Sequence, residues 1–530
     1  GFFTLPPGDR DESRFAQATK QMLETGDFVR IRNGAEERNR KPIGIHWLQL
    51  PFVAAAQAAG LARVNPIWPY RVPSALGALV AVLGTFSLGE FLVGRRAALL
   101  GAGLLAGSVI LSVEAHIAKT DAALLGSIVL FMGVLARAFL APATVGRGQA
   151  ALFWLAMAGS ILLKGPIGPM IAGLTALALL LLEREGKWLR VLRPGWGVPL
   201  LLAAVLPWFA AIGMATGGRF FSGAVGGDLG RKLQSGDDAH WGPPGLHLLL
   251  LPVLILPATA ALPGALARAW RDRADPALRF LLCWIVPSWL MFEAVPTKLP
   301  HYTLPLYPAL CLLAAAWLLA PERRAIARIA AALPVVVGVG LAAAVCLVPV
   351  ELGESVWLGL PGAAAAGAVA AVFLPLLGRA GPGRIGRERR ATLAALAAMP
   401  LLYWAVLGAE LPRLDPVWIA PRVVAALPPG PLGAVGFAEP SLMFLAGTDT
   451  RWLSPEEGAR ELLSGAVRTL LVADPQESAT LAEARKLGMQ PVPLAVLRGY
   501  NYSRGRFVTL WAFAREKQIS AHPPVRLTMD

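Results

Sequence analysis

The chain is dominated by apolar runs that are long enough to cross a lipid bilayer. A helix needs about 20 apolar residues to span roughly 30 Å of hydrocarbon, and the sequence offers runs of this kind repeatedly. No soluble core could hide so much apolar surface, so we expect a polytopic all-α membrane protein. About twelve spans are predicted, at 72–93, 97–113, 121–140, 149–163, 165–182, 197–215, 246–265, 277–294, 302–320, 328–350, 356–378 and 391–409.

Composition agrees with this fold class. Hydrophobic residues make up 55% of the chain and charged residues only 16%, whereas a soluble domain carries about 25% charged residues. Cys283, Cys311 and Cys346 all lie inside apolar runs, which indicates packing roles and argues against disulfides or a Cys-rich metal site. A net charge of +15 would suggest nucleic acid as the partner of a soluble protein. In a membrane protein, however, the positive charge is interpreted from the location of the basic residues in the loops. We therefore expect no nucleic-acid partner.

The basic residues gather in alternate loops. Clusters lie at Arg95–Arg96, Arg184–Arg193, Arg268–Arg279 and Arg379–Arg390, while the intervening loops carry isolated cations such as Lys119. Because cytoplasmic loops collect Lys and Arg, the clusters mark the cytoplasmic side. The alternation then places the acidic N-terminal segment and the C-terminus on the opposite side.

From residue 411 onward the sequence predicts a small α/β domain. Strands are expected at Val435–Phe437, Thr469–Ala473 and Val508–Phe513, helices at 455–465 and 477–487, and a turn at Gly499–Ser503. The segment contains no nucleotide-binding glycine motif. We therefore divide the chain into a first outer loop (1–70), a transmembrane helical domain (71–410) and a C-terminal α/β domain (411–530).

Polar residues gather near the outer ends of the predicted spans. Carboxylates beside a membrane are costly to desolvate and usually serve an ion, a proton or a substrate. Cations in the same place attract phosphate groups. Together these side chains suit a phosphate-bearing lipid substrate. The set comprises Asp11, Glu12, Arg14, Lys41, His46, Arg71, Asp121, Lys164, Arg231, Lys232, His240, Lys298, His301 and Tyr302.

Several motifs in this set resemble one membrane enzyme family. Asp11–Ala16, Asp-Glu-Ser-Arg-Phe-Ala, is similar to the Asp-Glu-Thr-Arg-Tyr-Ala of the family 39 glycosyltransferases, which include the bacterial aminoarabinose transferases acting on lipid A and the protein O-mannosyltransferases. Arg40–Gly44 resembles their Glu-Lys-Pro-Pro-Leu, Leu163–Pro166 their Thr-Lys-Gly turn, and Lys298–Pro305 their Lys-Leu-Pro-x-Tyr-x-Leu-Pro. Asp121 opens a predicted span, as the family's second aspartate does. Order and spacing make the combination specific over roughly residues 1–320.

The resemblance implies the GT-C architecture, with about thirteen spans and therefore one helix missing before Gly1. It also implies a periplasmic active site at the bacterial inner membrane, an inverting reaction, a polyprenyl-phosphate sugar donor, and lipid A or a related envelope glycolipid as acceptor. By the same resemblance Asp11 is the catalytic carboxylate and Lys41 orients it, while Lys298, Tyr302 and one of Arg231 or Lys232 hold the donor phosphate. The other substrate-binding candidates are Glu12, Arg14, Asp121, Lys164, His240 and His301.

Departures from the family pattern limit the transfer of roles. Arg40 stands where relatives have a glutamate that can bind a metal, so we assign no metal ligand, although a divalent cation stays open as a cofactor. Ile43-Gly44 and His46-Trp47 also depart from the family, so the sugar is not taken to be aminoarabinose.

Alternative interpretations stay open. The acceptor could be a protein hydroxyl, for which Asp11 must act as a base, or a lipid phosphate that is already ionised. A transporter or flippase for a lipid-linked saccharide would use similar residues, although the two halves of the chain show no internal repeat. Structural roles also compete: Asp11 and Asp121 suit helix N-caps, and Tyr302 suits an aromatic belt.

Overall fold

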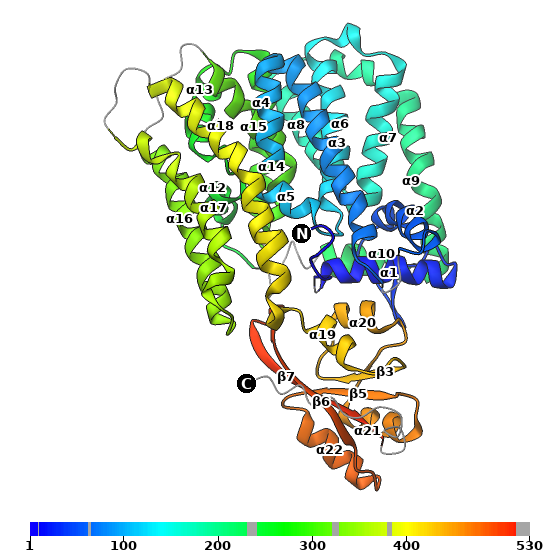
Figure 1. The fold of residues 1–530 in the computed structure, drawn as a ribbon. Helices are drawn as coiled ribbons and strands as arrows, with labels where there is room; N and C mark the ends of the chain where they lie inside the picture. The colour runs from blue at the N-terminus through cyan, green and yellow to red at the C-terminus, as the bar shows by residue number, and fades with distance from the viewer. Residues whose placement is uncertain (9, 62–64, 230–240, 321–327, 379–383, 516–530) are drawn as a thin grey trace.

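The structure is a computed structural model that describes residues 1–8, 10–61, 65–229, 241–320, 328–378 and 384–515. It has two parts. A large bundle of helices forms one part, and a small α/β domain lies against one end of the bundle (Figure 1). The expected combination of an all-α body and a C-terminal α/β domain is therefore present.

Seven helical segments of the described chain are long and apolar enough to cross a membrane. They are α3 (Trp68–Val93), α6 (Asp121–Leu140), α9 (Pro194–Thr216), α14 (Pro276–Ala294), the segment Pro300–Leu319 that includes α15 (Tyr307–Leu319), α16 (Arg328–Glu351), and Gly386–Arg413, which includes most of α18 (Arg384–Tyr403). Helices α4 (Arg95–Ala106) and α5 (Val109–Ala115) are bent by 60° and would make an eighth span together.

The remaining predicted windows also hold helices. They contain α7 (Arg147–Lys164), α8 (Ile167–Glu183), α12 (Leu246–Leu254), α13 (Leu262–Arg271) and α17 (Leu360–Ala371). Helices α7 and α8 are separated at the predicted Lys-Gly-Pro break, where Gly165 has a φ of 65° that favours glycine. The predicted number of twelve spans stays a prediction, because seven or eight segments of the described chain meet the length and hydropathy of a span.

Two short helices of the N-terminal region, residues 1–70, lie across one end of the bundle (Figure 1). Helix α1 (Asp11–Thr25) and helix α2 (Gly44–Ala58) are joined through a small hairpin of β1 (Arg32–Asn33) and β2 (Glu36–Glu37). A buried cluster of Phe15, Ile45, Ala123 and Leu163 packs α1 and α2 against α6 and α7. Apolar packing therefore fixes the start of α1 beside the ends of two bundle helices.

The C-terminal domain is built on a five-stranded mixed sheet in the order β4-β3-β5-β7-β6. Strand β3 is parallel to β4 and β5, and β7 is antiparallel to β5 and β6. The strands are β3 (Leu432–Val435), β4 (Arg451–Leu453), β5 (Thr469–Ala473), β6 (Val492–Asn501) and β7 (Arg506–Ala514). The helices are α19 (Ile419–Ala426), α20 (Pro440–Ala446), α21 (Pro455–Ser464) and α22 (Glu477–Lys486).

Helix α20 places the C-terminal domain against the N-terminal region, residues 1–70. Its Phe444 packs edge-on against Tyr70, with ring centroids 5.3 Å apart. Just beyond α20, the Thr448 hydroxyl accepts a hydrogen bond of 2.8 Å from Gln17 Nε2 on α1. The domain therefore lies on the same end of the bundle as Asp11.

Most of the predicted elements of the C-terminal domain are confirmed. Strands β5 and β7 and helices α21 and α22 lie where the sequence predicts them. The turn is displaced, because β6 continues to Asn501 and the turn occupies 502–505. The predicted first strand is also displaced, since β3 ends at Val435 and Gly436, with a φ of 77°, leaves the strand.

Candidate active site

Asp11 lies in the first turn of α1 and faces two cations from the segment that follows β2. Its Oδ1 accepts a hydrogen bond of 3.3 Å from Arg38 Nη2, and its Oδ2 accepts one of 3.4 Å from Lys41 Nζ. Both cations also lie over the buried ring of Phe15, at 5.0 Å and 4.8 Å from its centroid. Phe15 follows Asp11 by one helical turn, so α1 positions the carboxylate and the ring together.

These ion pairs keep Asp11 ionised. Burial alone would raise the pKa of Asp11, but Lys41 and Arg38 outweigh burial and hold this pKa well below its usual value. Burial lowers the pKa of Lys41 from 10.5 to about 8, against the attraction of Asp11. A carboxylate with so low a pKa is a weak general base. Asp11 is therefore better suited to holding cations and stabilising positive charge than to removing a proton.

A second carboxylate, Asp121, is the first residue of α6 and is 5% exposed. Lys164, the last residue of α7, donates a hydrogen bond to its Oδ1. Lys119 Nζ lies 3.7 Å from its Oδ2, and His301 Nε2 lies 3.8 Å from its Oδ1. The structure therefore brings three of the predicted site residues, Asp121, Lys164 and His301, into one cluster.

Glu114 belongs to the same cluster and is not among the sequence-predicted residues. It lies on α5 and is 3% exposed. Its Oε1 is 3.2 Å from Lys119 Nζ and 3.6 Å from His301 Nδ1. Its Oε2 has no hydrogen-bond partner among the described residues. A carboxylate just after the apolar run 97–113 is the signal that could have found it.

A cavity of about 410 Å³ opens between these charged groups and the bundle. Its charged and polar lining residues include Arg40, Lys41, Asp121, Lys164 and His301. The Lys164 ammonium lies 5.2 Å from the centroid of Tyr302, which also lines the cavity. The apolar walls include Leu124, Ile167, Met170, Phe209, Phe220, Phe221, Met291, Phe292 and Leu304. Two lysines thus face a space whose remaining walls are mostly hydrocarbon.

Known proteins resemble the chain in sequence and in structure. No family model matches it. It is 29% identical over 310 residues to the undecaprenyl phosphate-alpha-4-amino-4-deoxy-L-arabinose arabinosyl transferase of Pseudomonas aeruginosa. The aligned region covers 57% of this chain and 54% of the relative. The protein of the same name from Yersinia pestis is 26% identical over 455 residues, and the aligned region covers 78% of this chain and 74% of that protein. The chain spans about half the length of the Pseudomonas relatives it matches.

Solved structures cover almost the whole fold. The crystal structure of ArnT from Cupriavidus metallidurans bound to undecaprenyl phosphate matches with a TM-score of 0.75 and 21% identity, over 96% of this chain and 95% of that one. The chain therefore has the GT-C fold of this ArnT structure and is similar in sequence to the arabinosyl transferases. The archaeal oligosaccharyltransferase AglB matches more distantly, with a TM-score of 0.50 and 12% identity over 97% of this chain and 71% of that one. The predicted family resemblance and fold class are confirmed.

In this ArnT-like chain Glu12 lies away from the cavity. It is 5% exposed, and its carboxylate accepts hydrogen bonds from Arg71 Nε at 2.8 Å and Arg71 Nη2 at 3.1 Å. The backbone N–H groups of Gly8 and Ala118 donate to the same carboxylate at 2.7 Å and 2.9 Å. Protein groups therefore saturate Glu12, which ties the N-terminal segment to α3.

Lys298 and Arg14 are also absent from the described lining of the cavity. Lys298 is 5% exposed, and its Nζ donates to the carbonyls of Glu293 at 2.9 Å and Val295 at 2.6 Å. It thereby binds carbonyls at the carboxyl end of α14, a common position for a cation. Arg14 is half-buried on α1 next to Asp11, whose charge acts on it. Arg231, Lys232 and His240 lie outside the described residues.

Glu114, Asp121 and His301 could together hold a divalent cation, because one ligand atom of each lies within 4.8 Å of the others. Two carboxylates and an imidazole are a suitable donor set. The ammonium groups of Lys119 and Lys164 pair with the same carboxylates, however, and neutralise their charge. This arrangement fits a cluster whose cations are its lysines better than one built around a metal.

Proposed function

We propose that this chain is an inverting membrane glycosyltransferase that moves a sugar from polyprenyl phosphate to lipid A or a related envelope glycolipid. One observation carries the proposal: Lys41, Asp121 and Lys164 line one cavity whose other walls are mostly apolar, and Lys41 also pairs with Asp11 just outside the lining. The relatives named as undecaprenyl phosphate-aminoarabinose transferases and the ArnT structure bound to undecaprenyl phosphate support this reading.

The cavity matches the two halves of such a donor. A polyprenyl chain is hydrocarbon and gains free energy by contact with rings such as Phe209, Phe221 and Phe292. Its phosphate is an anion and binds ammonium groups such as Lys41 and Lys164, which line the cavity. The sugar would then lie at the polar end, near the carboxylates.

The charge state of Asp11 favours one type of acceptor. In the proposed reaction an acceptor oxygen attacks the anomeric carbon, the bond from that carbon to the donor phosphate breaks, and polyprenyl phosphate leaves with the bonding electrons. Asp11 is a weak base because its pKa lies well below the usual value. A phosphate acceptor is already ionised and needs no base, so Asp11 would stabilise the positive charge that develops on the sugar.

The basic clusters support a periplasmic site at the inner membrane. Arg95 is the first residue of α4 and Arg271 the last of α13, and Figure 1 shows α4 and α13 toward the end of the bundle away from α1 and α2. Since Lys and Arg collect on the cytoplasmic side, Asp11 and the C-terminal domain would face the periplasm.

The test is sugar transfer by the purified full chain in detergent, with a panel of radiolabelled polyprenyl-phosphate sugars as donors and extracted envelope lipids as acceptors. Asp11→Asn removes the charge of the carboxylate and should lower transfer by about 10²-fold or more. The matched control is Asp449→Asn at an exposed position of the C-terminal domain, which should keep wild-type activity.

Each outcome discriminates between functions. Transfer to lipid that is lost in Asp11→Asn and kept in Asp449→Asn supports the proposal and names the sugar. Transfer to added protein but not to lipid would replace the acceptor with a hydroxyl. An absence of transfer from every donor, with protein-dependent movement of lipid-linked sugar across liposomes, would contradict the enzyme reading.

A further inference from the structure

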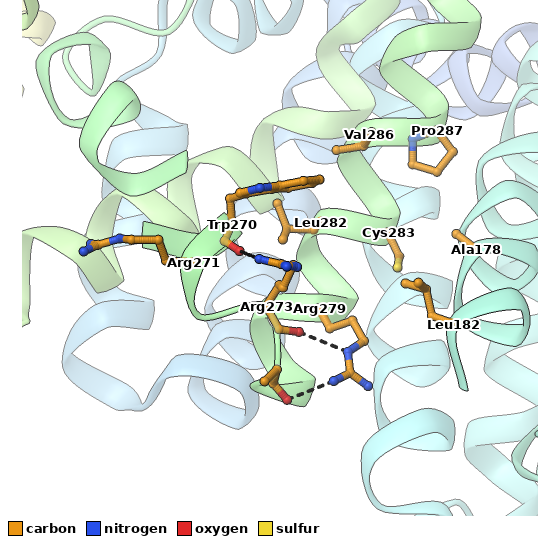
Figure 2. Close-up of a pocket in the computed structure, with 11 residues that line it drawn as sticks. Ala178, Leu182, Trp270, Arg271, Arg273, Arg279, Leu282, Cys283, Val286 and Pro287 are labelled. Atoms are coloured by element: carbon orange, nitrogen blue, oxygen red, sulfur yellow. Dashed lines mark hydrogen bonds between the residues drawn. The ribbon is translucent and has the colours of Figure 1, made fainter. Parts of the chain in front are cut away.

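A second cavity, of about 650 Å³, is lined by none of the residues that line the first one (Figure 2). It is bordered by α8, α13 and α14. Both α8 and α14 run from one cavity to the other: Met291 near the carboxyl end of α14 lines the first, and Arg279 near its amino end lines the second. Twelve residues of helix separate these two positions by about 18 Å. The second cavity is therefore distinct from the proposed sugar-transfer site.

Arginines at the mouth of this cavity carry positive charge that the protein does not balance. Arg279 is neutralised, because it pairs with Glu183 and donates to the carbonyls of Arg273 at 3.1 Å and Ala274 at 3.0 Å. Arg271 is exposed and makes no hydrogen bond or ion pair within the described chain. Arg273 is exposed and donates only to a carbonyl, that of Trp270, at 2.8 Å.

The nearby carboxylates already have partners. Asp272 pairs with Arg268 at 3.3 Å, and Asp275 caps α14 by accepting from the N–H groups of Ala277 and Leu278 at 2.8 Å and 3.0 Å. The cavity mouth therefore presents two guanidinium groups without a matched anion among the described residues. Guanidinium groups bind phosphate oxygens through paired hydrogen bonds.

Trp270 adds an interfacial aromatic side chain to the same place. Its ring is 60% exposed, and the Arg273 guanidinium lies 5.3 Å from its centroid. Figure 2 shows Arg273 beside Trp270, whereas the side chain of Arg271 extends on the other side of Trp270, away from the other labelled residues. Tryptophan prefers the level of the lipid headgroups. The cavity mouth therefore has the composition of a membrane–water interface.

The inner wall of the cavity is apolar and open. Leu182 on α8 is 63% exposed and Val286 on α14 is 40% exposed, and Leu282 and Pro287 continue this wall. Exposed aliphatic side chains on apolar helices of a membrane bundle are suited to contact with acyl chains. An anionic group at the arginines with hydrocarbon along Leu182 and Val286 would satisfy both parts of the cavity.

We propose that this cavity binds an anionic phospholipid, with its headgroup phosphate at Arg273, further positive charge from Arg271 beside it, and the first part of an acyl chain along Leu182 and Val286. Charge complementarity selects the occupant, since basic pockets between membrane helices are known to hold anionic headgroups. This site is independent of the proposed sugar transfer, because none of its residues lines the first cavity.

The test is a lipid titration of the purified full chain followed by native mass spectrometry. Phosphatidylglycerol is compared with phosphatidylcholine of the same acyl chains, and sn-glycerol 3-phosphate serves as a headgroup without chains. The variant is Arg271→Gln with Arg273→Gln. Its control, Arg147→Gln with Arg190→Gln, removes the same charge from exposed positions outside the cavity.

We expect the cavity variant to bind phosphatidylglycerol roughly 30-fold more weakly, from the contribution of two basic residues at an anionic lipid surface. The control should change this affinity less than twofold, and phosphatidylcholine binding should not respond. If the arginine variant does not fold, Leu182→Asp at an exposed position tests the site by placing a charge where the acyl chain would lie, and it should also weaken phosphatidylglycerol binding.

Three results would overturn the proposal. They are equal affinity of the wild type for both lipids, an equal loss in the Arg147 and Arg190 control, and binding of sn-glycerol 3-phosphate as tight as that of the lipid. The first two would reduce the effect to general surface charge, and the third would indicate a soluble phosphate in place of a lipid.

Discussion

The two ends of the bundle use charge in opposite ways. At the candidate active site, Lys164 and Asp121 form a buried pair, and Lys41 pairs with Asp11 at 3.4 Å. At the other end, Arg271 and Arg273 are exposed and have no carboxylate partner in the described chain. The first arrangement fixes the positions of the charged groups before a ligand binds. The second leaves the guanidinium groups free to bind anionic groups of the membrane. The comparison teaches that net charge alone does not locate a site, because the pairing of each charge and the cavity beside it decide what the charge can bind.

The sharpest way to break this comparison is to remove one partner of the most buried ion pair at the site end. Arg71 is 1% exposed and binds Glu12 through two nitrogens. Arg71→Met leaves the Glu12 carboxylate buried without its cation, which should cost about 3–5 kcal/mol. We expect a large fall in the thermal unfolding midpoint of the purified protein.

The double variant Arg71→Met with Glu12→Gln is the control, because it removes the charges together. It should recover part of the lost stability. An unchanged midpoint in the single variant would mean that water reaches Glu12, and the site end would then be no more preorganised than the opposite end.

Much of the fold could be predicted from the sequence, because it depends on local patterns. Apolar length predicts where helices lie, and the break at Gly165 and strands β5 and β7 follow from residue type. The motif resemblance also selects Asp11, Lys41, Asp121 and Lys164, which border or adjoin one cavity in the structure.

The partners of these side chains could not be predicted in the same way. Asp121 meets Lys164 and His301 from separate helices, and Glu114 completes the cluster without belonging to a recognised motif. The motif containing Lys298 suggests phosphate binding, yet its ammonium donates to two carbonyls of its own segment. Long-range packing determines the partner of each charged side chain, and this partner cannot be predicted from spacing along the chain.

A smaller effect should appear in the pH dependence of transfer. Burial lowers the pKa of Lys41 to about 8, so Lys41 loses its charge as the pH rises through that value. If the ammonium binds the donor phosphate, kcat/KM should fall about tenfold per unit above pH 8. In Lys41→Arg the guanidinium stays charged, so this fall should disappear even if the absolute rate is lower.

The contribution of Lys41 to the stability of the protein should rise with pH over the same range in which kcat/KM falls. The ordinary pKa of lysine is 10.5, above the value of about 8 for folded Lys41. Between these values the unfolded chain binds more protons at this position, so the contribution of Lys41 to stability rises with pH. A fall in kcat/KM that coincides with a falling unfolding midpoint would therefore contradict a direct role of Lys41.

The smallest effect is expected for an exposed ion pair at the arginine-rich end. Lys187 and Glu185 lie 3.3 Å apart, but their side chains are 78% and 61% exposed. Water screens such a pair, so Lys187→Gln should change stability by less than about 0.5 kcal/mol. The measurement is the unfolding midpoint, with Lys187→Arg as the charge-conserving control. A loss in Lys187→Gln that approaches the loss in Arg71→Met would show that exposed charges at this end also hold the fold, and the contrast between the two ends would then be one of location alone.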